Sequence, residues 1–251
     1  MRLLFVGDTH GSVDLAKVDA FLNEVRMTPN DALIHCGDFG APWASDHDAA
    51  LAYWRALPVK KLICLGNHEN YAFIGRQPIV RRFGCRGHDL GGGLFAPLAG
   101  QTVRVGGQRL WFYPGGYSID YMLRTPGHDL FSNEMLPLQA ARRIIQRFLR
   151  GNPVDFVVSH DGPRSFIFDM FGFQIGPPRP GYWAHLQQPP DSRAHPGIEL
   201  DVLRSAPHLY RAWYFGHHHR DIARGNLRCL WNRAALYDTR TGQTRLLPET
   251  P

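Results

Sequence analysis

The first 65 residues alternate between short apolar runs and amphipathic segments, and this alternation limits the possible folds more than any other feature. Three apolar runs have the length of buried strands, at residues 2–6, 31–36 and 61–65. Between them, residues 12–25 and 45–57 carry apolar side chains at helical spacing, with Ser12 and Ser45 as expected N-caps. The order β-α-β-α-β is typical of parallel strands joined by helical crossovers. We therefore expect an α/β fold.

The alternation weakens after residue 70. Glycines at 91–93 and 106–107 bracket short strand candidates, which we expect to form hairpins. Residues 138–151 predict a helix that stops at Gly151. Two further strands are predicted directly before the SHDG and GHHH sequences.

A chain of 251 residues can form one large domain, although two small domains are also compatible with this length. We expect a single domain over residues 1–251. Residues 164–197 are rich in proline, glycine and aromatic residues and show no period, which predicts a functional loop or lid. A poorly ordered insertion is the alternative.

Five polar clusters each follow a predicted strand directly. They are GDTHG (7–11), GDFG (37–40), GNHE (66–69), SHDG (159–162) and GHHH (216–219). Loops at the carboxyl ends of strands in α/β sheets meet at one crevice. Segments far apart in the sequence are therefore expected to lie together at one edge of a sheet.

The clusters supply oxygen and imidazole donors and no thiolate: Asp8, His10, Asp38, Asn67, His160, His217 and His219. Such a mixed set suits Mn, Fe, Zn or similar ions. Seven donors are too many for one tetrahedral site and suit two ions that share a carboxylate. In an extended chain, residues two apart point to the same side. His217 and His219 are therefore expected to face the metals while His218 faces away.

Other polar residues have more ordinary interpretations. The four cysteines form no C-x-x-C pair, so a thiolate site is not expected, and Cys36 and Cys64 are predicted to be buried. His35 is expected in the core. The histidines outside the clusters are expected to be structural or exposed: His47, His88, His128, His185, His195 and His208.

The net charge of +6 and the pI near 9.3 favour anionic partners, although a merely basic surface fits equally well. No apolar run approaches the roughly 18 residues of a membrane span. The amino terminus does not resemble a secretory signal, so we expect a protein of the reducing cytoplasm with no membrane partner.

The combination of D-x-H, G-D, G-N-H-E, a lone histidine after a strand and G-H-x-H, over residues 7–219, resembles the calcineurin-like metallophosphoesterase superfamily. This resemblance implies a sandwich of two mixed β-sheets flanked by α-helices, within the α/β (α+β) class. It implies one ion held by Asp8, His10, Asp38 and His219. It implies a second ion held by Asp38 as the bridging ligand, Asn67, His160 and His217. His68 would be the catalytic histidine beside the leaving group.

Two sequence details distinguish between branches of this superfamily. Protein Ser/Thr phosphatases of the superfamily continue the second motif as G-D-x-x-D-R-G, whose arginine grips phosphate, whereas this chain has GDFGAPW. The CGDF, GNHE and SHDGP sequences are similar to the branch that contains the RNA lariat debranching enzyme, which typically has a cysteine at the position of His10.

Glu69 and Asp161 are candidates to orient ligands. Arg124, Arg164 and Arg220 are candidate phosphate clamps, or else ordinary surface or structural arginines.

We therefore expect a phosphoesterase with two divalent ions, most simply Mn, with Fe, Zn, Ni or Co as alternatives. The ions would activate a hydroxide for attack on phosphorus. The basic charge and the missing arginine favour a phosphodiester in a nucleotide or nucleic acid as substrate. A phosphomonoesterase, including a protein phosphatase without the arginine, is the alternative. A non-catalytic scaffold of the same fold is a further alternative.

Overall fold

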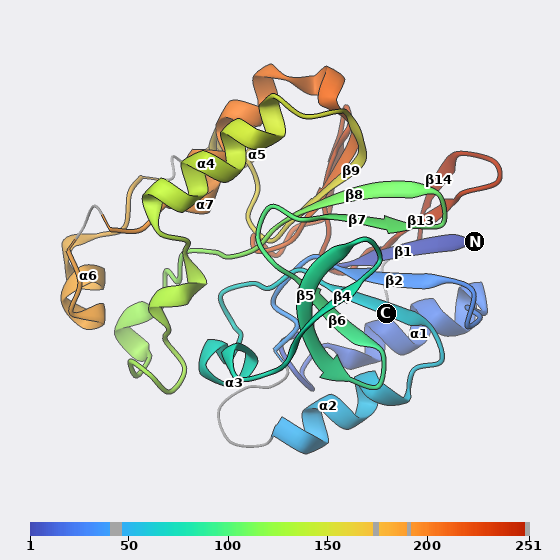
Figure 1. The fold of residues 1–251 in the computed structure, drawn as a ribbon, viewed down its shortest axis with the longest axis horizontal. Helices are drawn as coiled ribbons and strands as arrows, with labels where there is room; N and C mark the ends of the chain where they lie inside the picture. Colours follow the sequence, from blue (N-terminus) through green and yellow to red (C-terminus); the bar gives the residue numbers. More distant parts are fainter. Residues whose placement is uncertain (41–46, 173–175, 190–191, 249–251) are drawn as a thin grey trace.

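The computed structural model describes residues 1–40, 47–172, 176–189 and 192–248. Two β-sheets lie face to face, and helices cover the outer face of each sheet (Figure 1). The layers are therefore helix, sheet, sheet and helix. This is the sandwich of two mixed sheets flanked by helices that the resemblance implies.

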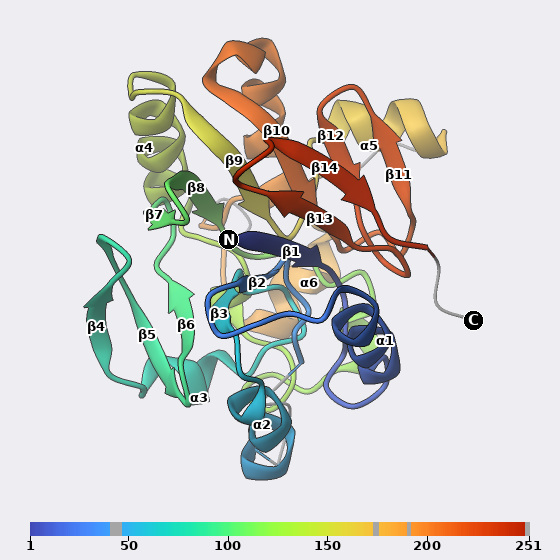
Figure 2. The same ribbon diagram turned by 90° about the vertical axis from the view of Figure 1, so that its right-hand side faces the viewer.

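The larger sheet has eight strands in the order β14-β13-β1-β2-β3-β6-β5-β4, with β4 at one edge (Figure 2). Its strands are β1 (Arg2–Val6), β2 (Ala32–His35), β3 (Lys60–Ile63), β4 (Ile79–Arg82), β5 (Cys85–Gly91), β6 (Leu94–Pro97), β13 (Ala235–Asp238) and β14 (Gln243–Leu246). The pairs β1–β2 and β2–β3 are parallel, as the β-α-β-α-β pattern predicts, and the pair β3–β6 is parallel too. Antiparallel strands complete both ends of the sheet.

The smaller sheet has six strands in the order β11-β12-β10-β9-β8-β7. They are β7 (Thr102–Val105), β8 (Gln108–Tyr113), β9 (Val154–Ser159), β10 (Tyr210–Phe215), β11 (Ile222–Arg224) and β12 (Leu227–Cys229). Strands β8, β9 and β10 run parallel to one another. The predicted glycine turns form the β5–β6 and β7–β8 hairpins.

Helices lie between successive strands from β1 to β4 and again from β8 to β10. The α-helices are α1 (Leu15–Val25), α2 (His47–Ala56), α3 (Tyr71–Gly75), α4 (Leu138–Leu149), α5 (Arg164–Phe171), α6 (Pro180–Leu186) and α7 (Pro196–Leu200). The 3-10 helices are η1 (Tyr121–Leu123), η2 (Ser132–Glu134), η3 (Asp201–Ser205) and η4 (Pro207–Leu209). None of the helices in the described ranges combines the length and the apolar character that crossing a bilayer requires.

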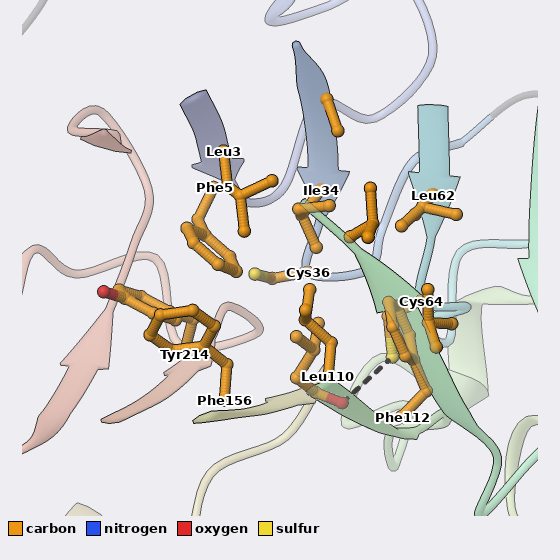
Figure 3. Packing of buried hydrophobic residues seen from close by; sticks show 14 of the residues in the cluster. Leu3, Phe5, Ile34, Cys36, Leu62, Cys64, Leu110, Phe112, Phe156 and Tyr214 are labelled. Carbon is orange, nitrogen blue, oxygen red and sulfur yellow. Dashed lines mark hydrogen bonds between the residues drawn. The ribbon is translucent and has the colours of Figure 1, made fainter. Parts of the chain in front are cut away.

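Alternate side chains of each central strand face opposite layers, as the two-residue period of a strand requires. In β1, Leu3 and Phe5 pack between the sheets, where they meet Phe156 and Tyr214 of the smaller sheet (Figure 3). The intervening residues of β1 pack against α1 and α2. One continuous core therefore joins the two sheets and fixes the relative position of their strand ends.

The start of α1 differs from the sequence expectation. Helix α1 begins at Leu15, so Ser12 is not its N-cap. Asp14 takes the N-cap position without a side-chain cap bond, because its carboxylate instead lies 3.1 Å from Nδ1 of His10. The predicted cap Ser45 lies outside the described residues.

Residues 164–197, which show no sequence period, contain helices. They comprise α5, α6 and the first residues of α7. Helix α6 stands apart from the sandwich, beside the segment that follows β8 (Figure 1). A small apolar cluster joins the two: Tyr117, Tyr121, Leu130, Met135, Tyr182 and Trp183. Helix α6 is therefore packed onto the loop after β8.

Candidate metal centre

The five motif loops meet at one edge of the sandwich. They follow the carboxyl ends of β1, β2 and β3 in the larger sheet and of β9 and β10 in the smaller sheet. Ligand atoms of two groups, each within 4.8 Å of one another, come together there. The first group is Asp8, His10, Asp38 and His219, and the second is Asp38, His160 and His217. Asp38 belongs to both groups.

The second group also includes the side chain of Asn67. Around Nε2 of His160 lie Oδ1 of Asn67 at 2.9 Å, Oδ1 of Asp38 at 3.1 Å and Nδ1 of His217 at 3.1 Å. Nδ1 of His160 lies 3.1 Å from the Cys36 carbonyl oxygen, which can only accept. When the ring is neutral, as a metal ligand must be, it therefore carries its proton on Nδ1 and turns the Nε2 lone pair towards the other acceptors. Converging acceptors require a proton or a cation between them, and this donor set fits a divalent ion.

The first group is more open. Nε2 of His10 lies 3.4 Å from Oδ2 of Asp38, while its Nδ1 faces the Asp14 carboxylate. Nε2 of His219 lies 3.9 Å from Oδ1 of Asp8. The His219 ring stacks on Trp231, with centroids 5.5 Å apart and planes 14° from parallel. Partners outside the group thus hold both imidazoles with Nε2 turned inward, an arrangement common for metal-binding histidines.

Five of these residues have left-handed backbone conformations: Asp8, His10, Asp38, His217 and His219, with φ between 46° and 69°. Such angles are uncommon outside glycine and cluster at functional sites. The expectation of an extended chain through GHHH is therefore wrong, because β10 ends at Phe215 and the next residues turn sharply. His217 lies in the second group and His219 in the first. His218 lies 2.9 Å from the Asp161 carboxylate.

Hydrogen bonds and close packing hold the strained loop at Asp8. The buried Lys17 ammonium donates to the Asp8 carbonyl oxygen at 2.6 Å, and the His217 backbone N–H donates to the Asp8 carboxylate at 2.9 Å. Gly216 allows this approach, because a Cβ there would lie 2.2 Å from Oδ2 of Asp8. The glycine of the GHHH motif is thus required by close contact with the carboxylate of another motif.

Glu69 and Asp161 tie neighbouring loops together. The buried Glu69 carboxylate accepts hydrogen bonds from the backbone N–H groups of Phe39 (3.1 Å), Gly40 (2.8 Å) and Gly66 (2.9 Å). Asp161 accepts from the Gly197 N–H at 2.8 Å as well as contacting His218. Both side chains orient loops rather than pointing at the ligand groups. His35 is a buried core residue, as expected.

The electrostatics of the two groups favour positive charge. Burial alone would lower the pKa of His160, but Asp38 and Asp8 raise it to about 10. Burial likewise opposes protonation of His10, yet Asp38 leads the carboxylates that raise its pKa to about 9. Burial disfavours the charge on Asp38, but the neighbouring histidines hold its pKa well below the usual range. Protons on His10 and His160 thus supply the positive charge that a metal ion would also supply.

His68 lies beside the two groups without belonging to either among the described residues. Its backbone N–H donates to Oδ1 of Asp38 at 2.8 Å, and its Nε2 lies 3.9 Å from Oδ2 of the same residue. Nη2 of Arg124 lies 3.2 Å from Nδ1 of His68 and also contacts Nε2. Burial lowers the pKa of His68 to about 4, and Arg124 adds to this effect. The ring is therefore neutral near pH 7.

Of the three candidate clamps, Arg124 lies nearest the centre. Its side chain is only 4% exposed, and Nη1 donates to the Asn67 carbonyl oxygen at 3.2 Å. Arg164 is exposed at the start of α5, and Arg220 donates to the His219 carbonyl oxygen from an exposed position.

Three residues near the centre were missed by the sequence reasoning: Gly116, Ser118 and Glu134. A Cβ on Gly116 would lie 2.7 Å from Oδ1 of Asn67 and 3.0 Å from Cδ2 of His160. Ser118 and Glu134 are fully buried and reach Asn67 through hydrogen bonds. One signal was available, since PGG directly follows β8 much as glycine follows the motif strands.

Comparison with known proteins bears on the fold and the family. A solved structure aligns over 99% of this chain and 99% of its own, at 12% identity and a TM-score of 0.51, which indicates a similar fold. An archaeal phosphodiesterase aligns over 98% of this chain and 99% of its own, at 10% identity and a TM-score of 0.41. A protein of unknown function from Aquifex aeolicus aligns over 64% of this chain and 80% of its own, at 17% identity and a TM-score of 0.34. The last two likenesses are too distant to bear on function.

A search of curated proteins finds no match to the sequence. The family model for calcineurin-like phosphoesterases matches residues 1–221, which contain all five motif loops. The chain therefore belongs to the calcineurin-like phosphoesterase family and is a hydrolase of phosphoric ester bonds.

Proposed function

We propose that the chain is a two-metal phosphodiesterase acting on nucleotides or nucleic acid. The observation that carries the proposal is the convergence of acceptor atoms from five loops into two groups that share Asp38. A shared carboxylate places two sites next to each other, as in-line displacement at phosphorus requires. The family match supports a phosphoric ester as substrate.

The proposed ligands are the residues of the two groups. Asp8, His10, Asp38 and His219 would hold one ion, and Asp38, Asn67, His160 and His217 would hold the other. When bound, two divalent ions would lower the pKa of a water molecule and neutralise phosphoryl oxygens. The nitrogen and oxygen donor set suits Mn²⁺ first, with Fe, Zn, Ni and Co as alternatives.

We assign proton donation to His68. Its Nε2 lies 3.9 Å from the shared carboxylate. The proton would come from the protonated ring, a form that the negative charge of a bound phosphoryl group would favour over the neutral ring of the substrate-free protein. The Arg124 guanidinium, which contacts this ring, is placed to bind a phosphoryl oxygen and to stabilise charge that develops on it.

A diester is favoured over a monoester on the grounds of charge. The net charge of +6 suits a polyanionic partner, and the GDFGAPW sequence lacks the phosphate-gripping arginine of the related protein phosphatases. We also propose a single domain, because both sheets share one core. Residues 164–197 would act as a cover, since α6 packs on the loop that carries Arg124.

A substrate screen tests this proposal. Purified protein with added Mn²⁺ is assayed against bis(p-nitrophenyl) phosphate, p-nitrophenyl phosphate, nucleotides, RNA and DNA. We expect faster hydrolysis of the diesters and no turnover after chelation. Faster hydrolysis of the monoester would identify a phosphomonoesterase instead. A protein that binds no metal after reconstitution and hydrolyses none of these compounds would be a scaffold.

The role of His68 is tested separately. In His68→Ala, metal content should persist while kcat falls about 10²–10⁴-fold, the range for a lost general acid. The loss should shrink for esters with good leaving groups, which need little protonation. Equal losses across leaving groups of different pKa would contradict proton donation and favour charge stabilisation.

A further inference from the structure

The proposed function leaves one fully buried carboxylate unexplained. Glu134 ends η2 and has no exposed surface. It accepts hydrogen bonds from the Ser118 hydroxyl at 2.8 Å, from the Ser118 backbone N–H at 3.3 Å and from the Tyr182 hydroxyl at 2.5 Å. A carboxylate removed from water is costly unless such partners satisfy it. Its placement among these donors therefore calls for a specific role.

With Glu134 ionised, the hydrogen bonds around Ser118 have a fixed direction. A hydroxyl has one proton to donate, and that of Ser118 goes to Oε2 of Glu134. The same oxygen can then only accept, and it accepts from Nδ2 of Asn67 at 3.2 Å. The amide of Asn67 is thereby held with its NH₂ group towards Ser118.

The opposite end of that amide faces the second ligand group. With Nδ2 on Ser118, Oδ1 of Asn67 lies 2.9 Å from Nε2 of His160. The two ends of an amide are nearly equal in size but opposite in hydrogen-bonding character. A flipped amide would present N–H donors to the metal position, where only an oxygen can serve as a ligand.

We infer that Glu134 is a positioning residue which, through Ser118, fixes the orientation of the Asn67 amide at the second metal site. This inference rests on the proposed function only for the identity of the ligand that the amide serves. The outer end of the hydrogen-bonded chain is Tyr182 of α6, so this helix, which packs on the segment after β8 (Figure 1), contributes to the same arrangement.

The first arm of the test is independent of metal. In metal-free protein labelled with ¹⁵N-asparagine, the Asn67 side-chain NH₂ protons should show nuclear Overhauser contacts to Ser118. Ser118→Ala removes the hydroxyl oxygen that accepts from the Asn67 amide. Glu134→Gln replaces the carboxylate that accepts from the Ser118 hydroxyl with an amide. Both variants should shift the Asn67 NH₂ resonances, and Glu134→Gln should weaken the contacts to Ser118. Unchanged resonances and contacts in Glu134→Gln would overturn the inference.

The second arm measures Mn²⁺ binding by calorimetric titration. Loss of a residue that orients a ligand typically costs about 10–100-fold in metal affinity, and we expect such a loss for one of two ions in each variant. In an Asn67→Ala background the same substitutions should cause little further loss, because their effect passes through that amide. If instead the substitutions lowered Mn²⁺ affinity as much in the Asn67→Ala background as in the wild type, Glu134 would act on the metal by another route. That result would also overturn the inference.

Controls separate positioning from general destabilisation. Asp31→Asn removes another buried carboxylate with several donors, just before the amino end of β2 and so at the opposite end from the motif loop. It should lower the melting temperature without changing Mn²⁺ affinity. Tyr182→Phe, which keeps the ring and removes only the outermost donor, should shift the Asn67 NH₂ resonances less than Ser118→Ala does.

The two proposals fail in different ways. Wild-type protein that binds no Mn²⁺ but shows the Asn67 contacts to Ser118, sensitive to Glu134→Gln, would refute the metal proposal and leave the positioning role intact. Two-ion binding with no response to Glu134→Gln or Ser118→Ala in either arm would refute the positioning role and leave the metal proposal intact.

Discussion

Gly116→Ala is a steric test of the second ligand group that changes no charge. Gly116 has no left-handed backbone angle, so alanine adds a methyl group without strain in the backbone. The new Cβ would lie 2.7 Å from Oδ1 of Asn67, 3.0 Å from Cδ2 of His160 and 3.1 Å from Cε1 of His217. Three proposed ligands of one ion would thus be displaced by a single methyl group.

The size of the effect follows from these distances. An ordinary contact begins near 3.4 Å, so Oδ1 of Asn67 must withdraw by about 0.7 Å from its 2.7 Å separation. Metal–ligand distances tolerate only about 0.2 Å. Overpacking of this kind typically costs about 1–3 kcal/mol of stability, which a domain of this size should survive. We therefore expect a folded protein whose second ion binds at least about tenfold more weakly.

The assay is calorimetric Mn²⁺ titration of metal-free protein, followed by elemental analysis. The first ion, held by Asp8, His10, Asp38 and His219, should bind with near wild-type affinity. Gly75→Ala is the matched control, because a Cβ at that exposed position meets nothing within 4 Å and its backbone is not left-handed. If Gly116→Ala bound two ions as tightly as Gly75→Ala, the second site could not lie among Asn67, His160 and His217.

Three further predictions concern single side chains. Asp38→Asn should lose at least one ion and most activity, since its carboxylate serves both groups; two ions with wild-type turnover would contradict the shared role. His218→Ala should keep both ions and cost less than about tenfold in kcat, measured by titration and steady-state kinetics, because His218 contacts Asp161 instead. Burial raises the pKa of Glu134 to about 7 against the opposing effect of its hydrogen bonds and of Arg124. The folded state therefore holds a proton that unfolding releases between about pH 4.5 and 7, and Glu134 should remove about 3 kcal/mol of stability as the pH rises through that window. Urea unfolding of the metal-free wild-type protein and of Glu134→Gln, each at pH 5 and pH 8, checks this. If the two proteins differed in free energy of unfolding by the same amount at both pH values, the prediction would be contradicted.

The elements that the sequence predicted well are those governed by local rules. Strands β1, β2, β3, β9 and β10 were visible as apolar runs that end at a polar motif. Their parallel arrangement followed from the helices between them. The carboxyl-end rule then placed the five motif loops together, and the structure brings them together at one edge. Short-range pattern and one topological rule were sufficient for this part of the site.

The backbone of the GHHH motif, which sets the directions of its histidine side chains, shows where a local rule fails. The two-residue alternation of an extended strand was applied to His217 and His219. Both histidines do lie in the two ligand groups that the resemblance implies, but both have positive φ, so the chain there is not extended. A left-handed conformation at a histidine is unfavourable by itself and persists only when its surroundings impose it. Those surroundings are contacts between motifs, such as the His217 N–H on Asp8, and no single motif contains them.

The three residues that were missed escaped prediction for the same reason. Gly116, Ser118 and Glu134 carry no ligand that a metal motif would require, and they lie between β8 and α4 in a segment without a sequence period. Gly116 is small because Asn67 and His160 occupy the space of its side chain. Glu134 is buried because Ser118 and Tyr182 satisfy it, not because its neighbours in sequence are apolar. The candidate ligands can thus be proposed from residue type and spacing. What orients them depends on packing between distant segments, and only the folded structure displays it.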